Sequence, residues 1–168
     1  MKLLKNSMKV ALALLLCHQA SAEDNLKFTG TLVVPPQCTI GLDDSGGLIE
    51  VAFPGRMPIS KINGENFMQP VPYHLKCGDG TPGLDLKLTL TGQSTYGDGV
   101  LKTNLGDLGI QIYYGSESSK TKFTLNKPID INYNSKPDLW AVPVNNPNGG
   151  VLTEGTFEAT ATLKAEYH

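Results

Sequence analysis

The chain has 168 residues and a formal net charge of −2 at pH 7, and 18% of its residues are charged. This mild acidity disfavours nucleic acid as a partner, and the single arginine, Arg56, excludes a site in which several arginines clamp phosphate or carboxylate groups. The length suffices for one domain with a sizeable core and is too short for two of ordinary size.

The N-terminus has the pattern of a secretory signal peptide. Three lysines precede a short apolar core at 10–16, and an Ala-Ser-Ala cleavage site ends at Ala22. We therefore expect export, with residues 1–22 removed. The apolar run is shorter than the roughly 20 residues that a membrane-spanning helix needs, so we expect the exported protein not to be inserted in a membrane.

The segment after the cleavage site alternates between apolar and polar residues. Leu26, Phe28, Gly30 and Leu32 share one face of the predicted strand, and two consecutive prolines separate this strand from the rest of the chain. The segment is either the first strand of the domain or an independent arm, 23–36. The glycine in the middle favours the arm, because it suits a site where another backbone comes close.

Two cysteines remain after export, Cys38 and Cys77. In an oxidising compartment they are expected to form a disulfide, and two separate buried thiols are the alternative. The loop between them is long enough for the bond to contribute roughly 4 kcal/mol through the entropy of the unfolded chain.

Short strands dominate the rest of the chain. Leucines at 84, 86, 88 and 90 alternate with polar neighbours, which is typical of a strand with one buried face. Glycine-containing turns separate nearly all the predicted strands, and the 11 prolines argue against long helices. The pattern indicates an all-β antiparallel sandwich of immunoglobulin-like architecture. Further strands are predicted at 39–42, 48–53, 71–77, 108–114, 122–125, 129–132 and 139–144.

The last predicted strand, 155–167, is the longest and cleanest. Only His168 comes after it. A terminal strand with an apolar face usually pairs within its own sheet, and its position alone does not decide its role. The apolar face consists of Phe157, Ala159, Ala161, Leu163, Ala165 and Tyr167.

Together these features resemble the pilin family of chaperone–usher fimbriae over essentially the whole exported chain. The resemblance rests on the arm with its central Gly30, on Cys38 and Cys77, and on the closing strand. As is typical of pilins, Gly155 stands fourteenth from the end and Tyr167 is penultimate. The resemblance implies a pilin domain at 37–168, an incomplete immunoglobulin-like β-sandwich that lacks its last strand and carries an N-terminal donor-strand arm.

The resemblance also implies a function, which is polymerisation by strand exchange. A periplasmic fimbrial chaperone would fill the open groove first, and at an outer-membrane usher the arm of a neighbouring subunit would replace it. The product would be a head-to-tail fimbrium on the bacterial surface that contributes to adhesion. The donated residues would be Leu26, Phe28, Gly30 and Leu32. The wall of the groove that meets the chaperone would comprise Gly155, Phe157, Ala159, Ala161, Leu163, Tyr167 and His168.

The resemblance bears on the place in the fibre as well. A tip adhesin of this family carries a second, lectin-like domain, for which the chain has no room. We favour a minor or adaptor subunit over the major rod subunit.

Other functions find little support in the sequence. His74 is the only histidine between the signal peptide and His168, and no hydrolase, metalloprotease or nucleotide-binding motif is present. We expect no enzyme, no catalytic residues, no cofactor and no bound metal. The main alternative is a freestanding secreted carbohydrate-binding sandwich, which needs a closed fold instead of an open groove. Its stacking platform would consist of Trp140, Tyr113, Tyr114 and Tyr133.

Overall fold

The computed structural model describes residues 26–32, 34, 37–78 and 85–167. The chain divides into two units, residues 1–33 and residues 34–168, which are described separately. In the first unit, residues 26–32 form no strand, although their alternation predicted one. The side chains of Leu26, Phe28 and Leu32 are 69%, 86% and 102% exposed, so the apolar face of this segment is not buried.

The second unit is built from short strands, which confirms the predicted all-β class. Two short 3-10 helices, η1 (Ile59–Lys61) and η2 (Tyr133–Ser135), are the only helices in the described residues. The strands are β1 (Cys38–Gly41), β2 (Gln69–Pro70), β3 (His74–Cys77), β4 (Asp85–Gly92), β5 (Ser94–Thr95), β6 (Gly97–Lys102), β7 (Leu108–Ser116), β8 (Ser119–Lys122), β9 (Ile129–Asn132), β10 (Asp138–Asn145) and β11 (Ala161–Tyr167).

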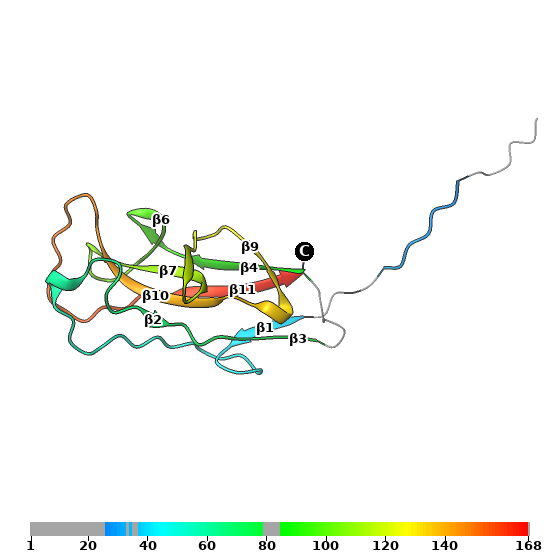
Figure 1. Ribbon diagram of the computed structural model, residues 1–168, viewed down its shortest axis with the longest axis horizontal. Coiled ribbons are helices and arrows are strands. Elements are labelled where there is room, and N and C mark those ends of the chain that lie inside the picture. Colours follow the sequence, from blue (N-terminus) through cyan, green and yellow to red (C-terminus); the bar gives the residue numbers. More distant parts are fainter. Residues whose placement is uncertain (1–25, 33, 35–36, 79–84, 168) are drawn as a thin grey trace, which may run out of the picture. The chain divides into compact units, whose positions relative to one another are not determined.

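These strands form three antiparallel sheets (Figure 1). The largest has the order β2-β10-β7-β6-β5, with β8 beside β7, and the others are β11-β4-β9 and the pair β1-β3. The register of β11 runs along β4 from Ala161 opposite Gly92 to Tyr167 opposite Leu86. Among the described strands β11 pairs with β4 alone, so its other edge forms no hydrogen-bonded ladder with them.

The core lies where the apolar faces of these sheets meet. Leu86, Leu88 and Leu90 of β4 are buried, as the alternation of this strand predicted. From the largest sheet, Ile110 and Ile112 of β7 join the same cluster of buried side chains. Strands of period two therefore direct alternate side chains into one shared core.

The predicted disulfide is confirmed. Cys38 stands opposite Cys77 in the register of β1 and β3, and the two sulfur atoms are 2.07 Å apart. The bond joins the start of β1 to the end of β3 and closes a sequence separation of 39 residues.

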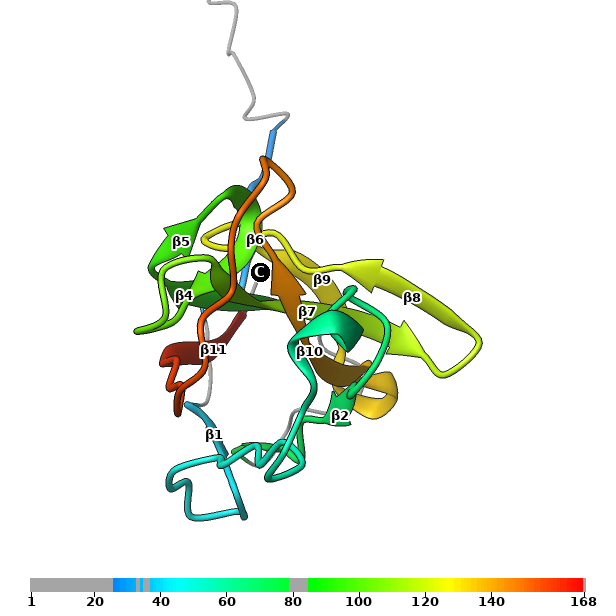
Figure 2. The same cartoon turned by 90° about the vertical axis from the view of Figure 1, so that its left-hand side faces the viewer.

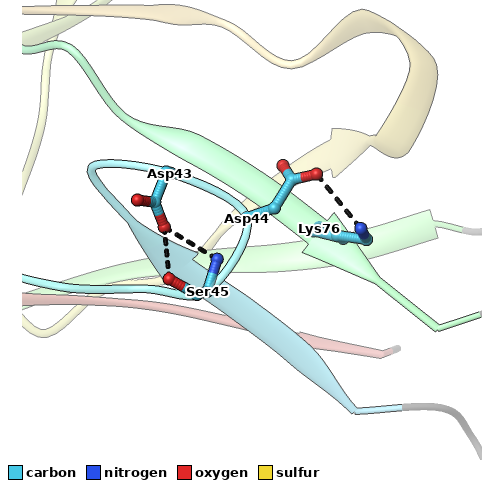
Figure 3. Close-up of polar contacts among 4 residues, drawn as sticks. All are labelled: Asp43, Asp44, Ser45 and Lys76. Atoms are coloured by element: carbon cyan, nitrogen blue, oxygen red, sulfur yellow. Dashed lines mark hydrogen bonds and ion pairs between the residues drawn. The ribbon is translucent and has the colours of Figure 1, made fainter.

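β1 ends in a tight turn that is held by local hydrogen bonds (Figure 3). The Asp43 carboxylate accepts from the Ser45 hydroxyl at 2.6 Å and from the Ser45 backbone N–H at 2.8 Å. These two bonds lower the pKa of Asp43. Asp44 forms an ion pair of 3.1 Å with Lys76 of β3, which ties the turn to the neighbouring strand. The turn leads the chain from β1 into residues 47–59.

Three predictions about strands differ from the structure. Residues 48–53 and 155–160 are in no strand. The strand predicted at 122–125 is wrong, because the paired strand in this region is β8, which ends at Lys122. Strand β6 was not predicted, because the sequence Asp98-Gly99 is typical of a turn. Gly99 is needed for close packing instead, since a Cβ there would lie 2.7 Å from the carbonyl oxygen of Phe123.

Candidate functional site

An open groove of about 1400 Å³ lies in the second unit. We call its two sides wall one, residues 47–59, and wall two, residues 152–163. Figure 2 shows the segment before β2 and the segment before β11 on opposite sides of this opening. Wall one includes residues 48–53 and wall two includes residues 155–160, which were both predicted as strands and are in no strand.

The floor of the groove is the core itself. It is formed by buried apolar side chains of four strands, among them Leu90 of β4, Leu101 of β6, Ile110 and Ile112 of β7, and Ala141 of β10. The core is therefore reached from outside along this groove. These floor side chains are themselves buried, and the more exposed apolar side chains of the groove lie in its walls.

Wall one lacks the backbone pairing of a strand. Within the described part of the chain, no backbone-to-backbone hydrogen bond involves residues 48–57. Ile49, Val51 and Phe53 are half-buried and pack against the core, whereas Leu48 is 76% exposed. Wall one thus has the side-chain alternation of a strand, and its backbone donors and acceptors remain available to a partner.

Wall two consists of the start of β11 and the segment before it. The segment before β11 is held by Asn104, whose backbone N–H donates to the carbonyl of Glu158 at 3.2 Å. The Asn104 side chain donates to the carbonyl of Thr156 at 3.2 Å and accepts from the backbone N–H of Glu158 at 2.7 Å. One residue therefore provides the contacts that a neighbouring strand would normally provide.

The two walls touch at one point. The rings of Phe53 in wall one and Phe157 in wall two have centroids 5.6 Å apart and are inclined by 50°. This is an ordinary distance for a favourable aromatic pair. The small side chains of Ala159 and Ala161, further along wall two, are exposed and leave the groove open there.

The structure places most of the predicted groove residues together. Tyr167 is half-buried against the core, with a buried hydroxyl that has no hydrogen-bond partner among the described residues, and His168 lies outside the described residues. Leu26, Phe28 and Leu32 are exposed in the first unit, as is Gly30. The predicted groove residues that lie in wall two are Gly155, Phe157, Ala159, Ala161 and Leu163.

Sequence reasoning missed wall one and Asn104. The alternation at 48–53 predicted a strand, and nothing in that pattern distinguished a paired strand from an unpaired wall. Asn104 lies far from wall two in the sequence and belongs to no motif. Only the fold brings Asn104 and wall two together.

The alternative aromatic platform is not assembled. Tyr113 and Tyr114 are successive residues of β7 and point to opposite faces, and Tyr114 packs edge-on against Phe123 at 5.4 Å. Tyr133 packs against the core, while Trp140 is the cross-strand partner of Tyr113 and shares its face, which is opposite to the face of Tyr114. The four rings therefore do not form one surface.

The described residues contain neither a candidate metal site nor a candidate membrane-spanning helix. No group of three or more histidine, cysteine, aspartate or glutamate side chains in them could hold a metal ion. In the same residues, no helix is long and apolar enough to cross a membrane.

The fold and the groove define a class of protein, the β-sandwich that lacks one strand and has a groove lined by core residues along the gap. The model of the family described as fimbrial protein matches residues 26–168. The chain therefore belongs to the fimbrial protein family.

Individual proteins are similar to this chain in sequence or in fold. The fimbrial-like protein YfcQ of Escherichia coli (strain K12) is 36% identical over 153 residues, which cover 88% of this chain and 89% of YfcQ. The P pilus adaptor subunit PapF has a similar fold, with a TM-score of 0.55 and 24% identity over 80% of this chain and 98% of PapF. The P pilus rod subunit PapA matches with a TM-score of 0.56 and 23% identity over 85% of this chain and 99% of PapA.

Proposed function

We propose that this chain is a structural subunit of a chaperone–usher fimbria and assembles by donor-strand exchange. The observation that carries the proposal is the groove, which is floored by core side chains and bounded by two walls whose backbone is not paired along the gap. A strand inserted there would gain main-chain hydrogen bonds from the walls and bury alternate side chains on the floor. The role is structural.

The inserted strand is the arm of a neighbouring subunit, within residues 23–36 that come after the signal peptide at 1–22. Leu26, Phe28 and Leu32 would enter the groove, and Gly30 would lie where the donated backbone comes closest to the floor. Their exposure in the free chain supports this role, because apolar side chains that find no burial in their own domain gain most from burial in another.

Before assembly a periplasmic chaperone occupies the same groove. Tyr167 at the C-terminal end of β11, together with His168, is the part of the pilin domain, 37–168, that meets the chaperone. The Tyr167 hydroxyl supports this placement, because it is buried without a partner among the described residues, and such a group costs stability until a partner is supplied. An outer-membrane usher then exchanges the chaperone for an arm, and the finished fimbrium serves adhesion at the cell surface.

One arm and one groove per subunit make the contact head-to-tail, so that it repeats into an open fibre. The proposal is tested with two complementary variants. A chain without residues 23–32 is expected to accept an arm but not to donate one. The variant Ala159→Trp, which fills the groove with a large side chain, is expected to donate but not to accept.

Each variant alone should therefore fail to polymerise, and their mixture should give a dimer and nothing longer. Size-exclusion chromatography with light scattering measures the products. The matched control is Lys164→Trp, which places the same side chain on an exposed residue of β11 that does not line the groove. Polymerisation of Ala159→Trp at the rate of the control would contradict the proposal.

A further inference from the structure

We propose that the turn between β6 and β7, residues 103–107, is a positioning element that holds wall two ready for an incoming strand. This inference rests on the proposed function, because it assigns a role in strand uptake to residues that lie outside the groove walls. It also accounts for Gly155, the residue whose place in the closing strand the sequence pattern singled out.

Thr103 makes the turn rigid. Its side chain is buried, with 3% exposure, and its Oγ1 lies 2.9 Å from the carbonyl oxygen of Leu105 and 2.8 Å from that of Leu108. The same Oγ1 accepts from the backbone N–H of Leu105 at 3.0 Å. The buried Thr103 hydroxyl thus links the start of the turn to Leu108 at its end, and this link constrains the backbone of the residues between them.

Asn104 projects from this turn onto wall two. Its three hydrogen bonds to Thr156 and Glu158 satisfy backbone groups on both sides of Phe157. Phe157 is the residue that meets Phe53 of wall one. The three hydrogen bonds of Asn104 therefore hold wall two next to Phe157, where the two walls are in contact.

Leu105 supports wall two from the adjacent position. A Cβ added to Gly155 would lie 3.3 Å from one methyl carbon of Leu105 and 3.7 Å from the other. Gly155 does not have a positive φ, so the left-handed conformation is not the reason for a glycine here. The Leu105 side chain packs against the backbone of wall two, and a larger residue at 155 would require its methyl group to shift by a few tenths of an ångström.

Asp107 holds the chain that leads into wall two. One carboxylate oxygen accepts from the backbone N–H of Val151 at 3.0 Å and the other from the side chain of Asn146 at 2.9 Å. The Asp107 carbonyl also accepts from the backbone N–H of Asn146 at 3.0 Å. One short turn therefore contacts the β10–β11 connection at both ends, at 146–151 and at 155–158.

The consequence concerns the rate of strand uptake. Wall two has its bound conformation before any strand arrives, so an arm does not have to order it during association. After insertion, the arm itself supplies backbone hydrogen bonds to the wall. Loosening the turn should therefore slow association more than it accelerates dissociation. Replacement of a residue that only stabilised the domain would lower the melting temperature and leave the association rate of the folded protein unchanged.

The test measures association and dissociation of a fluorescent peptide with the sequence of residues 23–35. The exported chain is used as it is isolated, alone or with its chaperone. We expect Asn104→Ala to slow association about tenfold, with a smaller change in dissociation, as expected when binding requires a change of conformation. Asn104→Asp keeps the acceptor for the Glu158 N–H and should fall between Asn104→Ala and the natural chain.

The matched control is Asn66→Ala. Asn66 is also an exposed asparagine whose side chain donates to a backbone carbonyl, that of Lys61 at 3.0 Å, outside both walls. Equal association rates for the Asn104 and Asn66 variants would overturn the inference and leave the proposed function intact. Failure of the natural chain to bind the peptide at all would instead reject the proposed function. If Asn104→Ala does not fold, the comparison of Asn104→Asp with the control decides in the same way.

Discussion

Replacement of Phe28 by alanine in the arm should weaken strand donation more than any change on the other face of the arm. Phe28 is 86% exposed in the free chain, so nearly its whole side chain is available for burial. Complete burial of such a side chain is worth about 1.5 to 3 kcal/mol. Because each 1.4 kcal/mol is a factor of ten in affinity, Phe28→Ala should raise the dissociation constant about 10-fold to 150-fold.

Competition between unlabelled arm peptides and a labelled natural peptide measures this effect. The control is Thr29→Ala, which changes the adjacent residue on the opposite face and should alter the affinity less than about threefold, a free-energy difference within the usual range for a surface substitution. Equal losses for the two peptides would refute the alternation on which the argument depends. No loss for Phe28→Ala would show that the groove does not bury this side chain.

The fold gives three further predictions. Removal of the disulfide by Cys38→Ser together with Cys77→Ser opens a loop with a sequence separation of 39 residues and should cost about 4 kcal/mol, which denaturant titration measures; an unchanged midpoint would contradict this. Phe123→Ala empties a fully buried site and should cost about 3 to 5 kcal/mol in the same assay, whereas a loss below about 1 kcal/mol would mean that the core is not packed as described. Burial first, and the Asp107 charge second, raise the pKa of Tyr96 from 10.0 to about 12, so the fold favours the protonated phenol. Its contribution is complete below pH 10 and is lost as the pH rises toward 12, and Tyr96→Phe should reduce the fall of the melting temperature across that interval; an identical fall in both proteins would refute the assignment.

Much of the fold could be predicted from the sequence, because the alternation of apolar residues reports directly on burial. The leucines of β4, the central segment of β7 and the pairing of Cys38 with Cys77 were all predicted and are present. Each of these depends on a local pattern or on the oxidising compartment.

The groove could be predicted only in part. Alternation at 48–53 and at 155–160 shows which side chains face the core, but it cannot show whether a neighbouring strand is present. Both segments therefore appeared as ordinary strands. Asn104 could not be found at all, since its role depends on contacts with residues that are more than 50 positions away in the sequence.

The central claim is that the domain is incomplete until a strand fills its groove. The most direct test is the melting temperature of the exported chain, without residues 23–32, in the presence of increasing concentrations of the 23–35 peptide. Because the peptide binds only the folded state, the melting temperature should rise with peptide concentration. At 100 times the dissociation constant, the free energy of unfolding should increase by about 2.7 kcal/mol. A chain that is stable alone, and whose melting temperature does not change with any concentration of the peptide, would contradict the account.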